Sequence, residues 1–186
     1  MKAYPELKIE LTLNDRFIDP IEEGVDVTIR IAALADSSLI ARKLAAARRV
    51  VAAAPAYLET HGVPKEPDDL LQHRCLHYGG LSPTHRWQLT RNGEPINVAV
   101  NAIMCSNNGD VLLAAALAGQ GIVLLPTFMA GPHIKAGHLK ALDDFQATEA
   151  GIYALYAANR YLAAKTRVLI DFLARRFGKT PSWDVF

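Results

Sequence analysis

The side chains that could carry out catalysis or bind metals are scattered along this sequence. None of its six histidines forms a clear helical metal-binding pair; His73 and His77 come closest, but they straddle the expected start of a strand. The two cysteines, Cys75 and Cys105, are far apart and lack C-x-x-C spacing, so both are expected to be reduced residues in small apolar environments. These patterns predict neither a metal site nor a reactive thiol.

Acidic pairs and glycine-rich stretches do not point to a reaction either. Glu22–Glu23 and Asp143–Asp144 are adjacent in the chain, and neighbouring carboxylates seldom converge on one reacting bond, so solvated turns are the favoured interpretation. The stretches "SNNGD" and "AGQGIVLLP" match neither a P-loop nor a dinucleotide fingerprint, and no G-x-S-x-G is present. The chain is therefore expected to bind a ligand rather than to be an enzyme, with no cofactor.

Polar residues do gather at the expected ends of strands and starts of helices, where open α/β sheets place their ligands. Ser106, Asn107 and Asn108 open an expected helix, whose free N–H groups and partial positive charge suit a carboxylate. These three residues either cap the helix only or also contact ligand. The candidate ligand-binding residues are Asn14, Asp15, Arg30, Tyr78, Gly79, Ser106, Asn107, Asn108, Pro126 and Thr127.

Arg30 is a special case because it falls on a strand that is expected to be buried. A buried guanidinium needs a partner. A structural carboxylate such as Asp26 or Asp36 is the favoured partner, and an anionic ligand is the alternative.

The first elements expected along the chain form a strand–helix–strand unit. Leu7, Ile9, Leu11 and Leu13 alternate with polar residues, which predicts a strand with one buried face. A short helix over residues 16–24 and a strand over 25–31 follow, so a parallel, right-handed βαβ unit is expected.

The rest of the sequence continues to alternate between strands and helices. Pro55 and Pro67 are expected to open short helices, Asn92-Gly93 predicts a hairpin, and residues 107–121 form the clearest helix. Further strands are expected at 39–45, 48–55, 74–78, 87–90, 96–104, 122–126 and 152–157, with a helical piece interrupted near Pro132. The last helix is expected to carry an apolar stripe of Val168, Leu169, Phe172 and Leu173. This order predicts an α/β protein with parallel strands covered by helices.

Composition and charge narrow the class of protein. Of the 186 residues, 51% are hydrophobic and 21% are charged, as in a globular protein, and the net charge of +1 gives no reason to expect direct DNA binding. No stretch has the length of a membrane span or the form of a signal peptide, so no membrane contact and a cytoplasmic location are expected.

Several stretches together resemble the effector-binding domain of LysR-type transcriptional regulators. The resemblance runs from "YPELKIELTLNDRFIDPIEEGVDVTIRIAALADSSLIARKLA" to "RCLHY", continues through "AALAGQGIVLLP", and ends in "YALYAANRYLAAKTRVLIDFLARRF". It implies a type II periplasmic-binding-protein-like fold, in which two α/β lobes enclose a ligand cleft and two crossing strands join them. Residues 1–45 and 150–186 would form lobe I, and residues 46–149 would form lobe II.

The resemblance also implies a function. A small-molecule effector, such as an organic acid or an aromatic compound, would bind between the lobes and favour one interlobe arrangement. The domain would act as a homodimer, and DNA would be bound through a helix-turn-helix domain that is absent from this chain. The family's domain also begins with a strand and a helix before "YPELKIEL", so the first strand and helix of lobe I are expected to be missing.

Three other interpretations stay open. A solute-binding protein of the same fold would serve transport, although the lack of a signal peptide counts against it. A small α/β enzyme would lose turnover on substitution of His77 or Asp110. A dimerisation module or inhibitor of full-length regulators would form mixed dimers with a longer relative.

Overall fold

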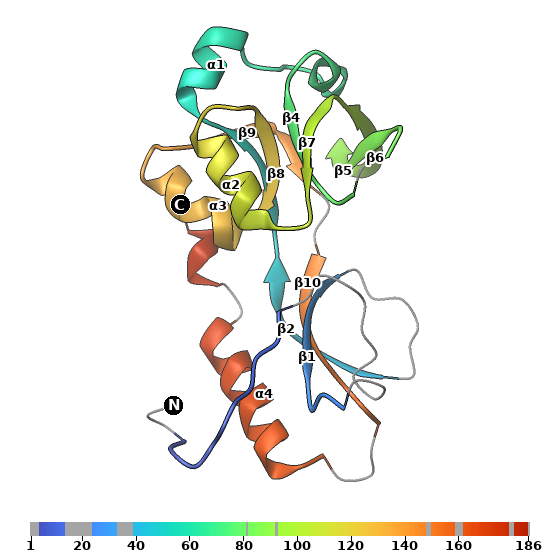
Figure 1. Ribbon diagram of the computed structural model, residues 1–186, viewed down its shortest axis with the longest axis vertical. Helices are drawn as coiled ribbons and strands as arrows, with labels where there is room; N and C mark the ends of the chain where they lie inside the picture. The colour runs from blue at the N-terminus through green and yellow to red at the C-terminus, as the bar shows by residue number, and fades with distance from the viewer. Residues whose placement is uncertain are drawn as a thin grey trace.

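The computed structural model consists of two lobes, one above the other, each built on its own β-sheet (Figure 1). It describes residues 4–13, 24–32, 39–80, 82–91, 93–147, 150–158, 162–178 and 181–185. The expected type II periplasmic-binding-protein-like architecture is confirmed.

Lobe I contains a sheet whose strands, in spatial order, are β1 (Thr28–Ala32), β10 (Ala150–Tyr156) and β2 (Ile40–Ala47). Both pairings are antiparallel. Helix α4 (Ala164–Phe177) covers one face, where Ile170 is buried against Leu44 and Ile152. The expected parallel arrangement is therefore wrong for this lobe, because β1 pairs with a strand more than 100 residues away rather than with its neighbour in the sequence.

The buried face of α4 agrees only in part with the expected stripe. Thr166 and Ile170 are its buried residues, whereas Phe172 is 40% exposed. Of the four expected residues, only Leu173 belongs to the described lobe I cluster. The helix packs on the sheet mainly through Thr166 and Ile170, which are spaced by four residues.

The strand predicted for residues 7–13 is not formed. In the described part of the chain these residues pair with no other strand, and Leu11 and Leu13 are 76% and 86% exposed. Alternating apolar residues show that one face could be buried, but a strand also needs a neighbour for its N–H and C=O groups. The helix expected over 16–24 lies outside the described residues.

Lobe II is built on a mixed sheet with the order β6-β5-β9-β3-β8-β4-β7. Among the described strands, only β4 runs parallel to its neighbours, β7 and β8. The strands are β3 (Arg49–Ala53), β4 (Cys75–Tyr78), β5 (His85–Arg91), β6 (Glu94–Val100), β7 (Ala102–Ser106), β8 (Ile122–Pro126) and β9 (Lys140–Ala147). The helices are α1 (Pro55–His61), the 3-10 helix η1 (Pro67–Leu71), α2 (Gly109–Leu117) and α3 (Thr127–Lys135).

Most expected elements of lobe II are present, with three corrections. The hairpin is confirmed, since β5 pairs antiparallel with β6 and Gly93 has a φ of 84°. The single strand expected over 96–104 is split at Asn101 into β6 and β7, and β9 was not predicted. Helix α3 runs through Pro132 without interruption.

Two apolar clusters fill the two faces of the lobe II sheet. One contains Val51, Tyr57 and Trp87, and the other lies beneath α2 and α3 and contains Leu112 and Leu125. These side chains are fully or almost fully buried, and each stabilises the fold by roughly 1.5–3 kcal/mol. They include residues of β4 and β8 and so fix these two strands in position.

The lobes are joined where the chain passes from one sheet to the other. Arg48 alone separates β2 from β3, and its carbonyl oxygen accepts hydrogen bonds from the N–H of Thr127 at 2.9 Å and from its hydroxyl at 3.2 Å. The return crossing lies between β9 and β10. The chain ends in the 3-10 helix η2 (Ser182–Asp184), which lies against α3 of lobe II.

Candidate ligand site between the lobes

The ends of β4 and β7 bring three of the predicted ligand residues together. Tyr78 lies opposite Ser106 in the parallel register, and the N–H of Gly79 donates to the carbonyl of Ser106 at 3.0 Å. Gly79 has a φ of 139°, and a Cβ there would lie 3.3 Å from Nε2 of His77. A larger residue would strain the backbone at this point, so the edge is built around a glycine.

The start of α2 adds the next group of predicted residues. The side-chain oxygen of Asn108 accepts from the N–H groups of Asp110 at 2.9 Å and Val111 at 3.3 Å, and the hydroxyl of Ser106 accepts from the N–H of Asn108 at 3.0 Å. Asn108 is therefore the helix cap. Asn107 is exposed, and its side chain makes no hydrogen bond to the described residues. Of the two asparagines, Asn107 is the one whose amide is available to a ligand.

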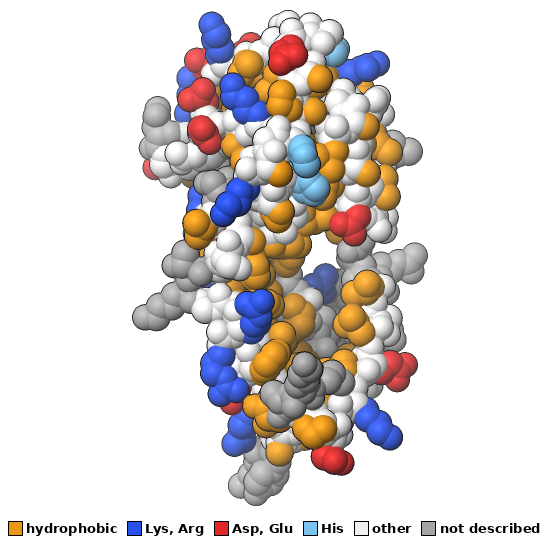
Figure 2. Space-filling view, turned by 90° about the vertical axis from the view of Figure 1, so that its left-hand side faces the viewer, with side chains coloured by type: hydrophobic (Ala, Val, Ile, Leu, Met, Phe, Trp, Pro, Cys, Tyr) orange, Lys and Arg blue, Asp and Glu red, His pale blue; other side chains and the backbone are white. Residues whose placement is uncertain are grey.

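This edge of lobe II faces lobe I. Figure 1 shows the connection from β7 to α2 at the lower margin of the upper lobe, directly above lobe I. In Figure 2 the surface is hollowed between the two lobes, with hydrophobic side chains on both sides of the hollow. The arrangement follows the rule that ligands bind beyond the carboxyl ends of parallel strands.

Thr127 and Pro126, at the end of β8, occupy a different environment. Thr127 is only 1% exposed, and its hydroxyl contacts both the carbonyl of Arg48 and the carboxylate of Asp184. Pro126 is half-buried beside it. The structure thus places Thr127 at the junction of the lobes, at the end of the strand that pairs with β4.

The predicted residues of lobe I are only partly described. Arg30 is half-buried on β1 and pairs in register with Tyr153 of β10, on the sheet face opposite α4. Asp26, one of its two expected structural partners, forms an ion pair with Lys165 at 2.7 Å. Asn14, Asp15 and Asp36 lie outside the described residues.

A group of aromatic and thiol side chains near Tyr78 was missed by sequence reasoning. The indole N–H of Trp87 donates to Nδ1 of His77 at 3.2 Å, so neutral His77 carries its proton on Nε2. The rings of His77 and His85 are 4.7 Å apart, and Nε2 of His85 lies 3.7 Å from the sulfur of Cys105. Burial, and secondly His85, lower the pKa of His77. No sequence spacing reveals the group, since the curling of the sheet brings β5 to β4.

Within the described ranges, no three His, Cys, Asp or Glu side chains are grouped so that they could hold a metal ion. The group of His77, His85 and Cys105 is therefore best described as a packed polar cluster beside the strand ends.

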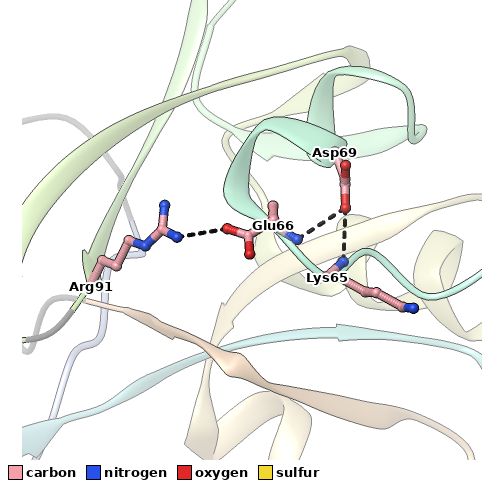
Figure 3. Close-up of polar contacts among 4 residues, drawn as sticks. All are labelled: Lys65, Glu66, Asp69 and Arg91. Carbon is pink, nitrogen blue, oxygen red and sulfur yellow. Dashed lines mark hydrogen bonds and ion pairs between the residues drawn. The ribbon is translucent and has the colours of Figure 1, made fainter.

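Two other hollows lie away from this edge. A shallow one of 550 Å³ is lined by residues including Pro55, Leu117, His133 and His138. A second, of 440 Å³, lies between η1, the β5–β6 hairpin and β9. Figure 3 shows two polar contacts beside it: Arg91 and Glu66, which both line the hollow, form an ion pair at 2.8 Å, and the carboxylate of Asp69 accepts from the N–H groups of Lys65 and Glu66. These two N–H bonds lower the pKa of Asp69. Neither hollow collects polar groups from both lobes.

No helix in the described parts of the chain is both long and apolar enough to cross a membrane.

Comparison with known protein families gives a match over nearly the whole chain. Residues 1–178 match the model of the LysR substrate binding domain. The chain is 34% identical over 179 residues to the HTH-type transcriptional regulator DmlR of Escherichia coli, covering 96% of this chain and 58% of DmlR. It is also 34% identical over 184 residues to the HTH-type transcriptional activator TtdR of Escherichia coli, covering 96% of this chain and 59% of TtdR. The chain thus spans about 60% of the length of these curated relatives.

Solved structures agree in fold. The regulatory domain of CrgA from Neisseria meningitidis is 28% identical, with a TM-score of 0.83 over 95% of this chain and 87% of that chain. The full-length virulence activator AphB of Vibrio cholerae is 32% identical, with a TM-score of 0.79 over 94% of this chain and 60% of AphB.

Proposed function

The chain belongs to the LysR substrate-binding domain family, and from this premise we propose that it binds a small metabolite between its lobes and thereby regulates transcription. The observation that carries the proposal is the set of polar groups at the interlobe edge of lobe II: Tyr78, Gly79, Ser106 and Asn107. Their geometry suits binding, and nothing in it requires a chemical reaction. On this proposal the protein is not an enzyme.

The proposed effector is an organic acid or an aromatic compound. The start of α2 carries a partial positive charge that favours a carboxylate, beside the negative charge of Asp110 in its first turn. The amide of Asn107 and the hydroxyls of Tyr78 and Ser106 can orient oxygen atoms, while the phenol ring of Tyr78, 48% exposed, offers an apolar surface. Arg30 on lobe I, together with Asn14 and Asp15, completes the proposed residue set. We include Asn108, Pro126 and Thr127 as residues that shape the site.

The proposed lobes comprise residues 1–45 with 150–186, and residues 46–149. The division is supported by the single residue Arg48 between β2 of one sheet and β3 of the other. An effector that binds one interlobe arrangement more tightly shifts the population toward it. In a complete cytoplasmic regulator, acting as a homodimer, this shift would change how helix-turn-helix domains meet a promoter.

The test is a search for the effector followed by a binding measurement. Small dicarboxylic, hydroxy and aromatic acids are screened for an increase in the melting temperature of the chain, because a ligand that binds only the folded state stabilises it. Isothermal titration calorimetry then measures the affinity of each acid that raises it.

We expect at least one acid to bind saturably with a stoichiometry of one per chain and to be recovered unchanged. Binding only at the two outer hollows, or conversion of the acid to a product, would contradict the proposal.

A further inference from the structure

The end of the chain connects the two lobes through an indole ring. Trp183 packs edge-on against Phe177 of α4, with ring centroids 5.4 Å apart, and against Phe128 of α3, at 6.2 Å. Phe177 belongs to lobe I and Phe128 to lobe II. One side chain therefore contacts both lobes, and any change in their relative position must alter at least one of these contacts.

A polar contact lies next to this ring. The carboxylate of Asp184 accepts a hydrogen bond from the hydroxyl of Thr127, the first residue of α3. Both the N–H and the hydroxyl of Thr127 are also within hydrogen-bond distance of the carbonyl of Arg48, which lies at the crossing between the lobes. Thr127 therefore links the end of the chain to the crossing.

The hydroxyl of Thr127 has one hydrogen but two acceptors, the carboxylate of Asp184 and the carbonyl of Arg48. If Asp184 moves away, the hydroxyl can still donate to Arg48. Release of the chain end therefore leaves no buried hydroxyl without a partner, and the usual penalty for breaking a buried hydrogen bond is avoided.

The docked position also leaves one polar group unsatisfied. The indole N–H of Trp183 is buried and has no hydrogen-bond partner among the described residues. Burial of an unpaired donor is unfavourable, and water would satisfy this group if the ring moved out. The favourable ring packing is thus opposed by an orphaned N–H, as expected of a contact that can open.

From these contacts we infer that residues Pro181–Val185, the strap, form a releasable link between the lobes, and that its docking on α3 favours one interlobe arrangement. The strap thereby regulates the movement on which effector sensing is proposed to depend. The inference concerns the lobes themselves, so it is tested without any effector and stands or falls separately from the proposed function.

The test measures the distance between the lobes by double electron–electron resonance. Spin labels are placed by Gln88→Cys on β5 and Arg167→Cys on α4, both exposed positions, in a Cys105→Ser background that leaves only the buried Cys75. We expect the unaltered strap to give one narrow distance distribution. Asp184→Ala, Thr127→Val and Trp183→Ala should broaden it or shift its mean, whereas Thr127→Ser, which keeps the hydroxyl, should not.

The matched control is Asp171→Asn, which removes the ion pair with Arg42 inside lobe I and should leave the distribution unchanged. Circular dichroism melting shows which variants are folded. If Trp183→Ala does not fold, Asp184→Ala and Thr127→Val decide the question. The inference would be overturned if the folded strap variants gave the same interlobe distance distribution as the unaltered chain. It would also be overturned if Asp171→Asn changed that distribution as much as the strap variants do.

Discussion

The N–H of Gly79 donates a hydrogen bond to the carbonyl oxygen of Ser106 at 3.0 Å. This bond extends the pairing of β4 with β7 one step past Tyr78 and ties the end of β4 to Ser106, two residues before the cap of α2. Backbone bonds therefore hold the edge of lobe II in place, and the side chains on it can be exchanged without loss of the sheet. This separation between scaffold and side chains allows binding and stability to be tested independently.

Two adjacent asparagines should respond differently to substitution. Asn107→Ala removes an exposed amide and is expected to weaken effector binding about fivefold, equivalent to about 1 kcal/mol, with an unchanged melting temperature. Asn108→Ala removes the cap of α2 and is expected to lower the free energy of unfolding by about 0.5–2 kcal/mol. Calorimetric titration and thermal melting measure the two effects.

Asn97→Ala is the control for both variants, since Asn97 is exposed on β6, away from the interlobe edge. Asn97→Ala should change neither the affinity for the effector nor the free energy of unfolding. If Asn107→Ala lowers the melting temperature as much as Asn108→Ala does, Asn107 is structural and its proposed ligand role is wrong.

The glycine before β8 should not accept a side chain. A Cβ on Gly121 would lie 2.5 Å from the carbonyl oxygen of Arg74, which is itself held by the N–H of Ile122 at 2.8 Å. Because backbone must move to relieve this overlap, Gly121→Ala is expected to lower the free energy of unfolding by about 2–4 kcal/mol.

Gly80→Ala serves as the matched substitution, because nothing lies within 4 Å of a Cβ there. Urea unfolding followed by fluorescence compares the two variants. Equal midpoints would show that β4 and β8 are less tightly fixed than the contacts indicate.

Stability should fall in mild acid because of two histidines in lobe II. The pKa values of His73 and His77 are lowered from their ordinary value of 6.5, in both cases chiefly because burial disfavours the charged imidazolium. The unfolded chain therefore binds protons at a higher pH than the folded chain. The free energy of unfolding should be constant above the unfolded pKa and should decrease as the pH drops below about 6.5, until the folded imidazoles also become protonated.

Urea midpoints measured between pH 8 and pH 5 test this dependence. The double variant His73→Gln, His77→Gln should show a flatter profile than the parent chain. The substitution His138→Gln, at an exposed histidine, measures at pH 8 the effect of a His-to-Gln exchange itself on the urea midpoint. A parent profile that stays flat to pH 5 would contradict the prediction.

The two cysteines should differ sharply in reactivity. Burial raises the pKa of the Cys75 thiol to about 12, whereas Cys105 is half-exposed at the end of β7. Since the thiolate is the reactive form, a disulfide reagent at pH 8 is expected to modify one thiol in the folded chain and both after denaturation. In Cys105→Ser the folded chain should show no reaction; rapid labelling of that variant would mean that lobe II opens readily.

Local features of the fold were predictable from the sequence. The Asn-Gly hairpin, the cap of α2 at Asn108, and Pro55 at the start of α1 each depend on the conformational preference of one or two residues, and each is confirmed. The antiparallel pairing of β1 with β10 was not predictable in this way, because the two strands are far apart in the sequence.

The predicted strand over residues 7–13 and the unpredicted strand β9 show two ways in which hydrophobic alternation gives a wrong prediction of strands. Residues 7–13 have the pattern but no partner strand among the described residues. β9 has partners but an irregular pattern, because its register with β3 shifts between Val50 and Ala52 and leaves Asp143 and Asp144 exposed within the strand. Likewise, the family resemblance implied a site between the lobes, but only the structure distinguishes Asn107 from the cap Asn108 and places Thr127 at the crossing.

The measurement that tests the central claim most directly is a map of backbone amide shifts on titration with an acid that binds. We predict that the largest shifts cluster at Tyr78, Gly79 and residues 106–109 of lobe II, together with amides at the facing end of lobe I, near Ala32 and Gly151. Shifts confined to the hollow at His133 and His138, or to the one at Lys65 and Arg91, would contradict an effector site between the lobes.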